Sequence, residues 1–171
     1  MEYIFEDFIA GFIQEKFSNE WTIVPQESKE HLATNASNEK VFRMRHDIFM
    51  TRIDDKKRVI IDTKYKLRNK TFDKGDPKKK GIDQVDLYQM ISYAFRRKCT
   101  DVILFYPNIS EIGESKEIEP DEFKITSGFD NSQFISITAY EIPFWSATKD
   151  FNLNGLRDKL ESILKKIFAK F

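Results

Sequence analysis

The sequence predicts an α/β (α+β) protein in which a central mixed β-sheet is flanked by helices. Apolar residues recur at helical spacing near both ends of the chain, in residues 2–17 and 153–170. Between them lie short apolar runs of strand length, and one of these, residues 101–107, directly follows a third helical stretch. A strand that follows a helix in this way usually pairs in parallel. The 171 residues are expected to form a single domain, 1–171.

The N-terminal half is expected to contain one helix followed by three strands. The strand assignments rest on runs of apolar and β-branched residues, and the polar stretch 27–40 is expected to be a loop. The last two strands would form a hairpin with Asp54 and Asp55 at the tip of its turn, because Asp favours turn positions. The expected elements are a helix at 2–17 and strands at 21–26, 41–50 and 58–66.

The C-terminal half is expected to alternate helix and strand and to end in a helix. Asp83 can cap a helix, because its carboxylate can accept hydrogen bonds from the first free backbone amides. A basic stretch, 67–82, contains Gly and Pro and is expected to be a loop, as is the acidic stretch 108–130. The expected elements are a helix at 83–98, strands at 101–107 and 134–142, and a helix at 153–170.

Composition excludes several classes of protein. The net charge is zero, which argues against a general nucleic-acid binder, and 33% of the residues are charged, as in ordinary globular proteins. Apolar runs fall short of the ~20 residues that cross a bilayer, and the acidic amphipathic N-terminus does not resemble a signal peptide. The single cysteine, Cys99, excludes an internal disulfide and is typical of a reducing compartment. We therefore expect a cytoplasmic protein with no membrane association.

Charge is unevenly distributed along the chain. Residues 64–80 contain eight Lys or Arg and two Asp, whereas residues 111–122 contain six Asp or Glu and one Lys. Such runs are most often solvated loops. The basic run is of special interest because it begins at Lys64, just after the apolar run of "VIIDTKYK", where Asp62 interrupts a strand that otherwise reads as buried. A buried charge costs several kcal/mol unless it is paired or bound to a metal.

Two carboxylates are expected to face each other across the predicted hairpin. With a two-residue turn at Asp54 and Asp55, residue i pairs with residue 109 − i, so Asp47 lies opposite Asp62 on one face. The Cβ atoms of such a pair are ~4.5–5.5 Å apart, and two bare carboxylates at that distance repel each other. A divalent cation between them would remove the repulsion. Lys64 lies on the same face, one pleat further along.

The expected helix at 83–98 supplies further polar candidates. Gln89 and Tyr93 are four residues apart and therefore lie on one helix face, with Asp86 and Met90 beside them. Gln89 interrupts an otherwise apolar run, and a buried glutamine needs hydrogen-bond partners. A cleft that holds a metal ion, a water or a phosphate would supply those partners. The alternative is that Gln89 faces solvent at the boundary of the helix.

These motifs, in this order, resemble those of the PD-(D/E)xK nuclease superfamily, whose fold is a restriction-endonuclease-like core. The matching segments are "RHDIFM", "IIDTKYK" and "QMISY", and Gln-x-x-x-Tyr resembles the RecB-like branch. The fuller pattern of "DTKYK", "DLYQMISYA" and "ILFYP" is most similar to the nuclease domain of McrC, over residues 3–107. McrC is the cleavage subunit of modification-dependent restriction systems. His46 stands where relatives usually have a proline, a change that leaves the aspartate ligand in place.

The resemblance implies a metal-dependent DNA endonuclease that hydrolyses phosphodiester bonds in antiviral defence. Asp47 and Asp62 would bind Mg²⁺, or Mn²⁺ in its place, and the backbone carbonyl of Thr63 would be a further ligand. Lys64 would orient the attacking water or stabilise charge on the phosphate. Glu6 matches a first-helix glutamate that reaches toward the metal in many relatives; the alternative is an ordinary surface glutamate.

The remaining side chains receive supporting roles from the same resemblance. Gln89 and Tyr93 would line the cleft and position the water or the DNA backbone. His31 and His46 are expected to be structural or exposed rather than catalytic. Cations of the basic run would contact phosphates without reading the base sequence. These expected DNA contacts are Lys66, Arg68, Lys70, Lys78, Lys79 and Lys80.

The resemblance also implies partners. McrC-type proteins act with the AAA+ GTPase McrB, which they engage through an N-terminal region that this sequence lacks. The chain would therefore be an excised domain, a shortened relative or a stand-alone nuclease. Double-strand cleavage of DNA would need two copies, as in a homodimer, or a repeated visit. Two alternatives remain open: a catalytically inactive DNA-binding or assembly module on the same fold, and an interaction subunit whose acidic loop 111–122 docks a partner.

Overall fold

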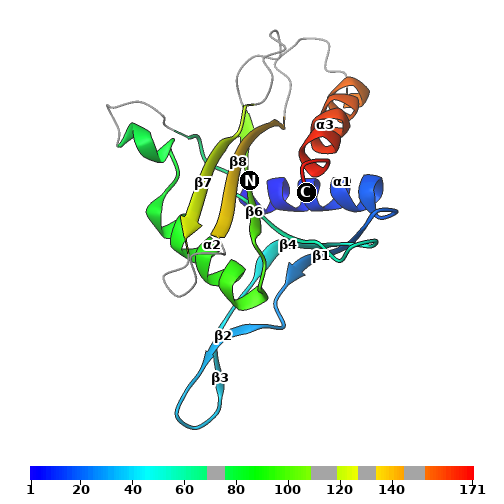
Figure 1. The fold of residues 1–171 in the computed structure, drawn as a ribbon. Helices are drawn as coiled ribbons and strands as arrows, with labels where there is room; N and C mark the ends of the chain where they lie inside the picture. The colour runs from blue at the N-terminus through cyan, green and yellow to red at the C-terminus, as the bar shows by residue number, and fades with distance from the viewer. Residues whose placement is uncertain (69–75, 109–118, 127–133, 145–152) are drawn as a thin grey trace.

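A six-stranded mixed sheet forms the centre of the structure, with the strand order β1-β4-β5-β6-β8-β7 (Figure 1). The computed structural model describes residues 1–68, 76–108, 119–126, 134–144 and 153–171. The helices are α1 (Glu2–Phe17), α2 (Gln84–Arg97) and α3 (Leu153–Phe168), with a short 3₁₀ helix, η2, at Pro77–Lys79. The strands are β1 (Trp21–Glu27), β2 (His31–Thr34), β3 (Lys40–Arg43), β4 (His46–Arg52), β5 (Arg58–Thr63), β6 (Asp101–Asn108), β7 (Asp121–Thr126) and β8 (Phe134–Pro143). The expected mixed sheet with flanking helices is confirmed.

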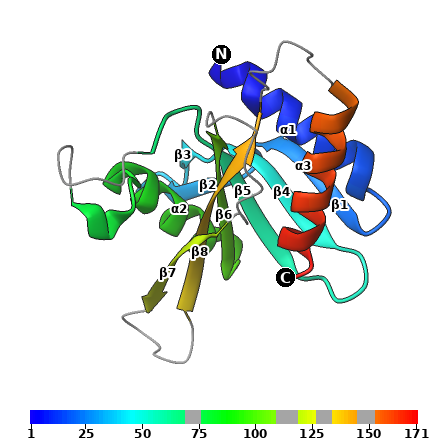
Figure 2. The ribbon, with the colours of Figure 1, turned by 90° about the horizontal axis from the view of Figure 1, so that it is seen from above.

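Helices cover both faces of this sheet, with α1 and α3 on one side and α2 on the other (Figure 2). Successive residues of a strand point to opposite faces. Ile61 and Phe105 accordingly pack with α1 and α3, whereas Ile60 and Leu104 pack with α2. Strands β5 and β6 are therefore buried on both faces, as their unbroken apolar runs indicate.

Strand pairing confirms the two directions that the sequence predicts, an antiparallel β4–β5 hairpin and a parallel β6. Strand β4 runs antiparallel to its two neighbours, β1 and β5, whereas β5, β6 and β8 run parallel to one another. In the β4–β5 hairpin Ile48 pairs with Ile61 and Met50 with Val59, which is the expected register. The same register continued by one residue places Asp47 across from Asp62, at the end of the sheet where β4 begins and β5 finishes.

Two expectations for the segment before β4 are wrong. Residues 27–40 are not simply a loop, and the expected strand at 41–50 is divided into β3 and β4. β2 and β3 pair with each other as a separate two-stranded sheet, whereas β4 pairs with β1. β2 carries mostly exposed side chains, so it lacks the apolar alternation by which strands are found in a sequence.

Two further expectations need correction. The strand expected at 58–66 finishes at Thr63, so Lys64 follows the strand rather than lying within it. The amide of Lys64 still donates to the carbonyl of Phe105, at 2.8 Å, before the chain turns away. The acidic stretch 108–130 contains a strand, β7, whose Phe123 and Ile125 alternate with exposed residues. That alternation is visible in the sequence but is obscured by the surrounding charge.

The expected helices are confirmed to within two residues at each end. Asp83 caps α2 as expected, because its carboxylate accepts a hydrogen bond from the amide of Val85 at 3.0 Å. The helix ends at Lys98, which adopts a left-handed conformation with φ 51°. Asp83 therefore fixes the start of the helix that carries Gln89 and Tyr93.

The packing of α3 can be tested with a matched pair of leucines. Leu160 is fully buried against α1 and the sheet, whereas Leu153 on the same helix is 49% exposed. Leu160→Ala should lower the free energy of unfolding by about 2–5 kcal/mol, because it removes buried apolar contacts and leaves a cavity. Leu153→Ala should change it by no more than about 0.5 kcal/mol. Chemical denaturation of both variants measures the difference, and equal effects would contradict this packing.

Candidate active site

A polar pocket of about 270 Å³ lies at the end of the sheet where β4 begins and β5 finishes. The first two turns of α1 form one side of the pocket, and the middle of α2 forms another. Antiparallel pairing is what brings residue 47 and residues 62–64 to the same edge, although they are far apart in the chain. The lining residues are Glu2, Tyr3, Glu6, Arg45, Asp47, Asp62, Thr63, Lys64, Gln89 and Tyr93.

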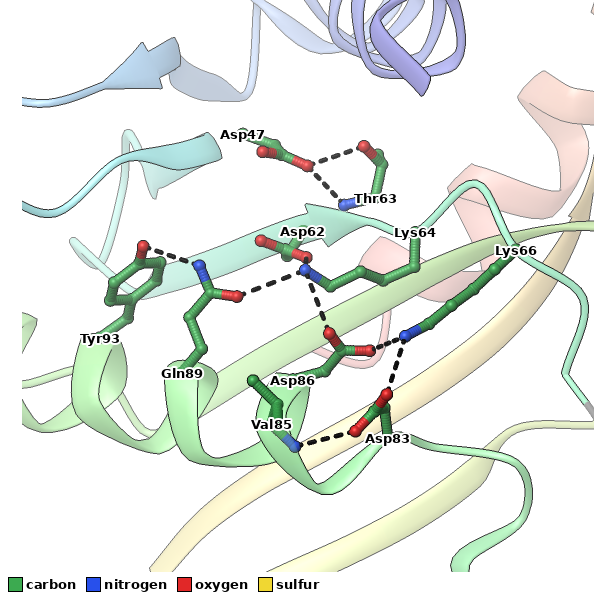
Figure 3. Close-up of polar contacts among 10 residues, drawn as sticks. All are labelled: Asp47, Asp62, Thr63, Lys64, Lys66, Asp83, Val85, Asp86, Gln89 and Tyr93. Atoms are coloured by element: carbon green, nitrogen blue, oxygen red, sulfur yellow. Dashed lines mark hydrogen bonds and ion pairs between the residues drawn. The ribbon is translucent and has the colours of Figure 1, made fainter. Parts of the chain in front are cut away.

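Asp47 is held against the end of β5 by Thr63. One carboxylate oxygen of Asp47, Oδ2, accepts hydrogen bonds from both the amide and the hydroxyl of Thr63, each at 2.7 Å (Figure 3). Hydrogen bonds to an ionised carboxylate are among the stronger ones in proteins. They fix the carboxylate of Asp47 next to the residue that precedes Lys64.

Asp62 is the most deeply buried carboxylate of the pocket, with 3% of its surface exposed. Burial raises the pKa of Asp62 to about 7, and the negative charge of Asp47 contributes to the same shift. The ammonium of Lys64, 2.6 Å away, opposes this shift. Asp62 is therefore a carboxylate that one lysine neutralises only in part.

Lys64 lies among three acceptors (Figure 3). Its Nζ atom is 2.6 Å from Asp62, 3.4 Å from Oε1 of Gln89 and 3.7 Å from Asp86. Burial by itself would lower the pKa of Lys64, but the carboxylates of Asp62 and Asp86 outweigh it and raise that pKa. Lys64 therefore carries its full positive charge in the pocket.

One face of α2 presents three polar side chains to the pocket and its edge. Gln89 accepts from Lys64 through Oε1 and donates from Nε2 to the hydroxyl of Tyr93 at 2.9 Å. The alternative that Gln89 faces solvent is wrong. Asp86, one turn earlier, also binds Lys66, at 2.5 Å. The sequence pattern gave Asp86 no role, although its spacing of three from Gln89 is a signal that both share this face.

Glu6 reaches the pocket from α1. It is only 6% exposed and lies 3.6 Å from the guanidinium of Arg45, so the alternative of an ordinary surface glutamate is wrong. Burial raises the pKa of Glu6, and the charge of Asp47 adds to the shift. The electrostatic effect of Asp47 on both Glu6 and Asp62 indicates a pocket in which carboxylates outnumber nearby cations.

The donor set of the pocket suits a hard divalent cation. Within the described ranges, no group of three or more His, Cys, Asp or Glu side chains is already arranged to hold an ion. Mg²⁺ does not require such a group, because it commonly keeps several waters and uses one or two carboxylates together with substrate phosphate. Asp47 and Asp62 supply two carboxylates, and the pKa of Asp62 is raised first by burial and then by the charge of Asp47, which a cation would offset.

A known protein family matches the part of the chain that contains the pocket. The family described as "McrBC 5-methylcytosine restriction system component" matches residues 1–107. The chain belongs to this family. The matched residues include every lining residue of the pocket, from Glu2 to Tyr93. No curated protein matches the chain.

Neither histidine of this McrBC family member lines the pocket. His46, which directly precedes Asp47, is fully buried, and its ring lies 4.6 Å from that of Tyr93. Its Nδ1 lies 3.2 Å from the carbonyl oxygen of Glu27, and burial lowers the pKa of His46. His31 is half-buried in β2, outside the pocket. His46 thus positions the start of β4 against α2.

The basic run does not act as one surface. The expected DNA contact at Arg68 is wrong, because its side chain is 1% exposed and its guanidinium pairs with Asp121 at 2.6 Å. The same guanidinium lies over the ring of Tyr106 and donates to the carbonyl of Lys80. Lys66 is partly exposed but is bound by Asp86. Lys70 lies outside the described residues, whereas Lys78, Lys79 and Lys80 are exposed beside the start of α2.

Two further observations bear on partners. Residues 111–118 of the acidic stretch 111–122 lie outside the described residues, so the expected docking loop stays a prediction. In the described part of the chain, no helix combines the length and apolar character needed to cross a membrane.

The buried carboxylate of Asp62 should give metal-free protein a characteristic pH dependence. Its pKa is about 7 in the folded state and 3.8 as the unperturbed value. Between these values the unfolded chain releases a proton that the folded chain retains, so stability falls as the pH rises from about 4 to 7. Each unit of pKa difference corresponds to roughly 1.4 kcal/mol.

Asp62→Asn should therefore flatten the decline in stability across this range. Denaturation in EDTA at several pH values measures the decline, and Asp158→Asn, at an exposed position of α3, is the matched control. Parallel curves for the parent and Asp62→Asn would show that the Asp62 carboxyl is not perturbed in this way.

Proposed function

We propose that this chain is a metal-dependent DNA endonuclease of the PD-(D/E)xK type, the nuclease subunit or domain of a McrBC-like restriction system. The observation that carries the proposal is the convergence of Asp47, Asp62 and Lys64 in one pocket, with Gln89 beside the lysine. These residues come from two strands and a helix, in the order that the nuclease motifs require. Membership of the McrBC family supports a role in restriction.

The pocket fits a bound Mg²⁺ or Mn²⁺ ion. Asp47 and Asp62 would hold it, and the Thr63 carbonyl and Glu6 are the further oxygen donors that line the pocket or adjoin it. When bound, the ion supplies Lewis acidity to the scissile phosphate and lowers the pKa of a coordinated water. Asp62 must be ionised to act as a ligand, so binding near neutral pH would release a proton from the protein.

Lys64 is the side chain of the pocket that would act directly on the phosphate. Its ammonium is charged and lies at the wall of the pocket, and Asp86 and Gln89 hold it in addition to Asp62. A cation at Asp62 would reduce the negative charge available to Lys64, while the other two partners remain. The ammonium can then donate to a phosphate oxygen and stabilise charge as it develops during hydrolysis. Gln89 contacts the ammonium of Lys64, and Tyr93 holds Gln89 by a hydrogen bond, so the two residues position the lysine.

Binding of DNA is assigned to exposed cations beside the pocket. Lys78, Lys79 and Lys80 lie before α2, whose first turn holds Asp83 and Asp86. Exposed lysines attract backbone phosphates without reading sequence. A McrB-like GTPase is the proposed partner in restriction, and cleavage of both DNA strands would require a second copy of the active site.

A catalytically inactive DNA-binding or assembly module is the second candidate. The 2.6 Å contact between Lys64 and Asp62 favours it to some degree, because a buried ion pair at a strand end can be purely structural. The two candidates differ in their response to metal. A nuclease needs the Asp62 carboxylate free to bind a cation, whereas a structural pair does not.

Asp62→Asn tests the ligand role, because it keeps the size of the side chain and removes its charge. Mg²⁺-dependent nicking of plasmid DNA should fall by at least about 100-fold, since one of two protein carboxylate ligands is removed. Titration calorimetry should show weaker metal uptake and loss of the accompanying proton release, which is measured by comparing two buffers. Asp158→Asn should retain both properties. Unchanged metal affinity together with abolished activity would refute the ligand role.

Lys64→Ala separates metal binding from chemistry. The variant should still take up Mg²⁺ or Mn²⁺, because both carboxylates remain, but it should not cleave plasmid DNA. The same calorimetric and nicking assays apply. A parent protein that neither binds Mg²⁺ nor nicks DNA would favour the inactive module instead.

The lysines before α2 can be distinguished from Arg68 by their effects. Replacing Lys78, Lys79 and Lys80 by Ala should weaken DNA binding and flatten its salt dependence by about 0.9 in log–log slope for each phosphate that is no longer neutralised. Arg68→Ala should leave the slope unchanged but destabilise the protein by about 3 kcal/mol, because a buried ion pair loses one partner. DNA affinity at several salt concentrations and thermal denaturation measure the two effects. An unchanged slope in the triple variant would show that these lysines are merely solvated.

A further inference from the structure

The segment between β1 and β4, residues 28–45, forms an arm that projects from the body of the protein (Figure 1). We call it the β2–β3 arm. β1 ends at Glu27 and β4 begins at His46, and these two residues are paired. Asp47 comes next in β4 and belongs to the pocket. The base of the arm is therefore at the edge of the sheet that carries the proposed active site.

The base of the arm is firmly attached to the body. Met44 is 1% exposed, and its amide donates to the carbonyl of Glu30 at 2.9 Å. Arg96, from the last turn of α2, donates to the carbonyl of His31 at 2.8 Å. Arg43 donates to the carbonyl and to the hydroxyl of Ser28, at 2.9 and 2.8 Å. The arm therefore holds a defined direction although it has no core of its own.

An exposed apolar pair lies near this base. The register of β2 and β3 places Leu32 opposite Phe42, and their exposed fractions are 41% and 72%. Phe42 has φ 57°, a left-handed conformation that is unfavourable for a bulky residue. A strained and exposed ring is costly for stability, and such residues concentrate at binding sites.

The arm that carries the apolar pair has an excess of positive charge. The arm contains Lys29, Lys40, Arg43 and Arg45 against two acids, Glu30 and Glu39. Both acids have partners inside the protein: Glu30 pairs with Arg96 at 3.3 Å, and Glu39 accepts from Asn35 at 2.7 Å. Lys29 and Lys40 are exposed. The surface thus combines an exposed aromatic ring with cations. Such a surface suits a nucleic acid, whose phosphates are negatively charged and whose bases can stack on the ring.

We propose that the β2–β3 arm is a DNA-binding element that inserts Phe42 between bases while Lys29 and Lys40 contact phosphates. Apolar wedges flanked by cations are a general means of gripping and bending a duplex. The inference rests on the proposed function in taking DNA as the substrate, but it concerns a surface outside the pocket. A protein partner is less favoured, because it would gain little from exposed lysines around a single ring.

The position of the arm also gives an approximate length for the contact. α2 runs from the exposed lysines at 78–80 to Arg96 at the arm, with Gln89 of the pocket between them. Its 14 residues span about 20 Å at 1.5 Å per residue. One DNA strand advances about 3.4 Å per nucleotide, so the length of α2 corresponds to about six nucleotides. The arm and the lysines would hold DNA on either side of the pocket.

The test uses the full chain in EDTA, where no cleavage occurs, and a short DNA duplex that carries 2-aminopurine, whose fluorescence rises when it is unstacked. Phe42→Asn removes the ring, and Asn tolerates the left-handed conformation. It should weaken binding about tenfold, because the stacking of one base on the ring is lost, and it should abolish the fluorescence rise. The melting temperature of the protein variant should not fall below that of the parent protein. Phe42→Trp, which keeps an aromatic ring, should retain both the DNA affinity of the parent and the rise in 2-aminopurine fluorescence.

Phe134→Asn is the matched control, because Phe134 is 50% exposed at the start of β8, at the opposite end of the sheet. It should bind DNA within about twofold of the parent, well inside the tenfold that about 1.4 kcal/mol represents. Parent-like binding by Phe42→Asn, or no fluorescence rise with the parent protein, overturns the proposal. So does a Phe42→Asn variant that loses self-association in sedimentation velocity but keeps its DNA affinity, which would identify a protein contact.

The outcome for the arm can be separated from the outcome for the pocket. Phe42-dependent DNA binding by a parent that does not nick plasmid with Mg²⁺ would refute the proposed nuclease and support the arm. Metal-dependent nicking with binding that does not depend on Phe42 would refute the arm alone.

Discussion

The carboxylate of Asp62 lies near the end of β5, a strand that is buried on both faces. A buried carboxylate must be neutralised, and much of the structure around β5 follows from that requirement. β5 is covered by α1 and α3 on one face and by α2 on the other, so Asp62, the last residue but one of the strand, has little access to solvent. Asp47 lies close enough to raise its pKa further. Lys64 compensates in part, and this incomplete neutralisation is the physical basis for expecting a cation in the pocket.

The compensation extends outward as an alternating series of charges (Figure 3). Asp62 binds Lys64, Lys64 lies near Asp86, Asp86 binds Lys66, and Lys66 lies 3.7 Å from Asp83. Asp83 is also the cap of α2. The segment that leaves β5 is thereby tied to the first turns of the helix that carries Gln89. The electrostatics of the pocket and the position of α2 therefore depend on each other. A substitution at Asp62 or at Asp83 would affect the other end of this series of charges.

Positive charge in this chain serves two different purposes that a count of residues does not separate. Arg68 is buried beneath Asp121 and Tyr106, where it joins the chain after β5 to the edge strand β7. Lys78, Lys79 and Lys80 remain at the surface. The β2–β3 arm adds cations at the other end of α2, from a segment that lies outside the basic run 64–80. The surface proposed to meet DNA is thus assembled from two distant parts of the chain on either side of the pocket.

Local periodicity and simple register arithmetic were enough to predict the helices, the directions of the central strands and the meeting of Asp47 with Asp62. These features depend on neighbours in sequence or on one hairpin, for which the physical rules act over short range. The β2–β3 arm was missed because its strands bury almost nothing and so leave no apolar pattern. The burial of Glu6, the pairing of Lys64 with Asp86 and the withdrawal of Arg68 from the surface could not be predicted. Each depends on how α1, α2 and β7 pack against the sheet, and only the tertiary structure determines which side chains that packing encloses.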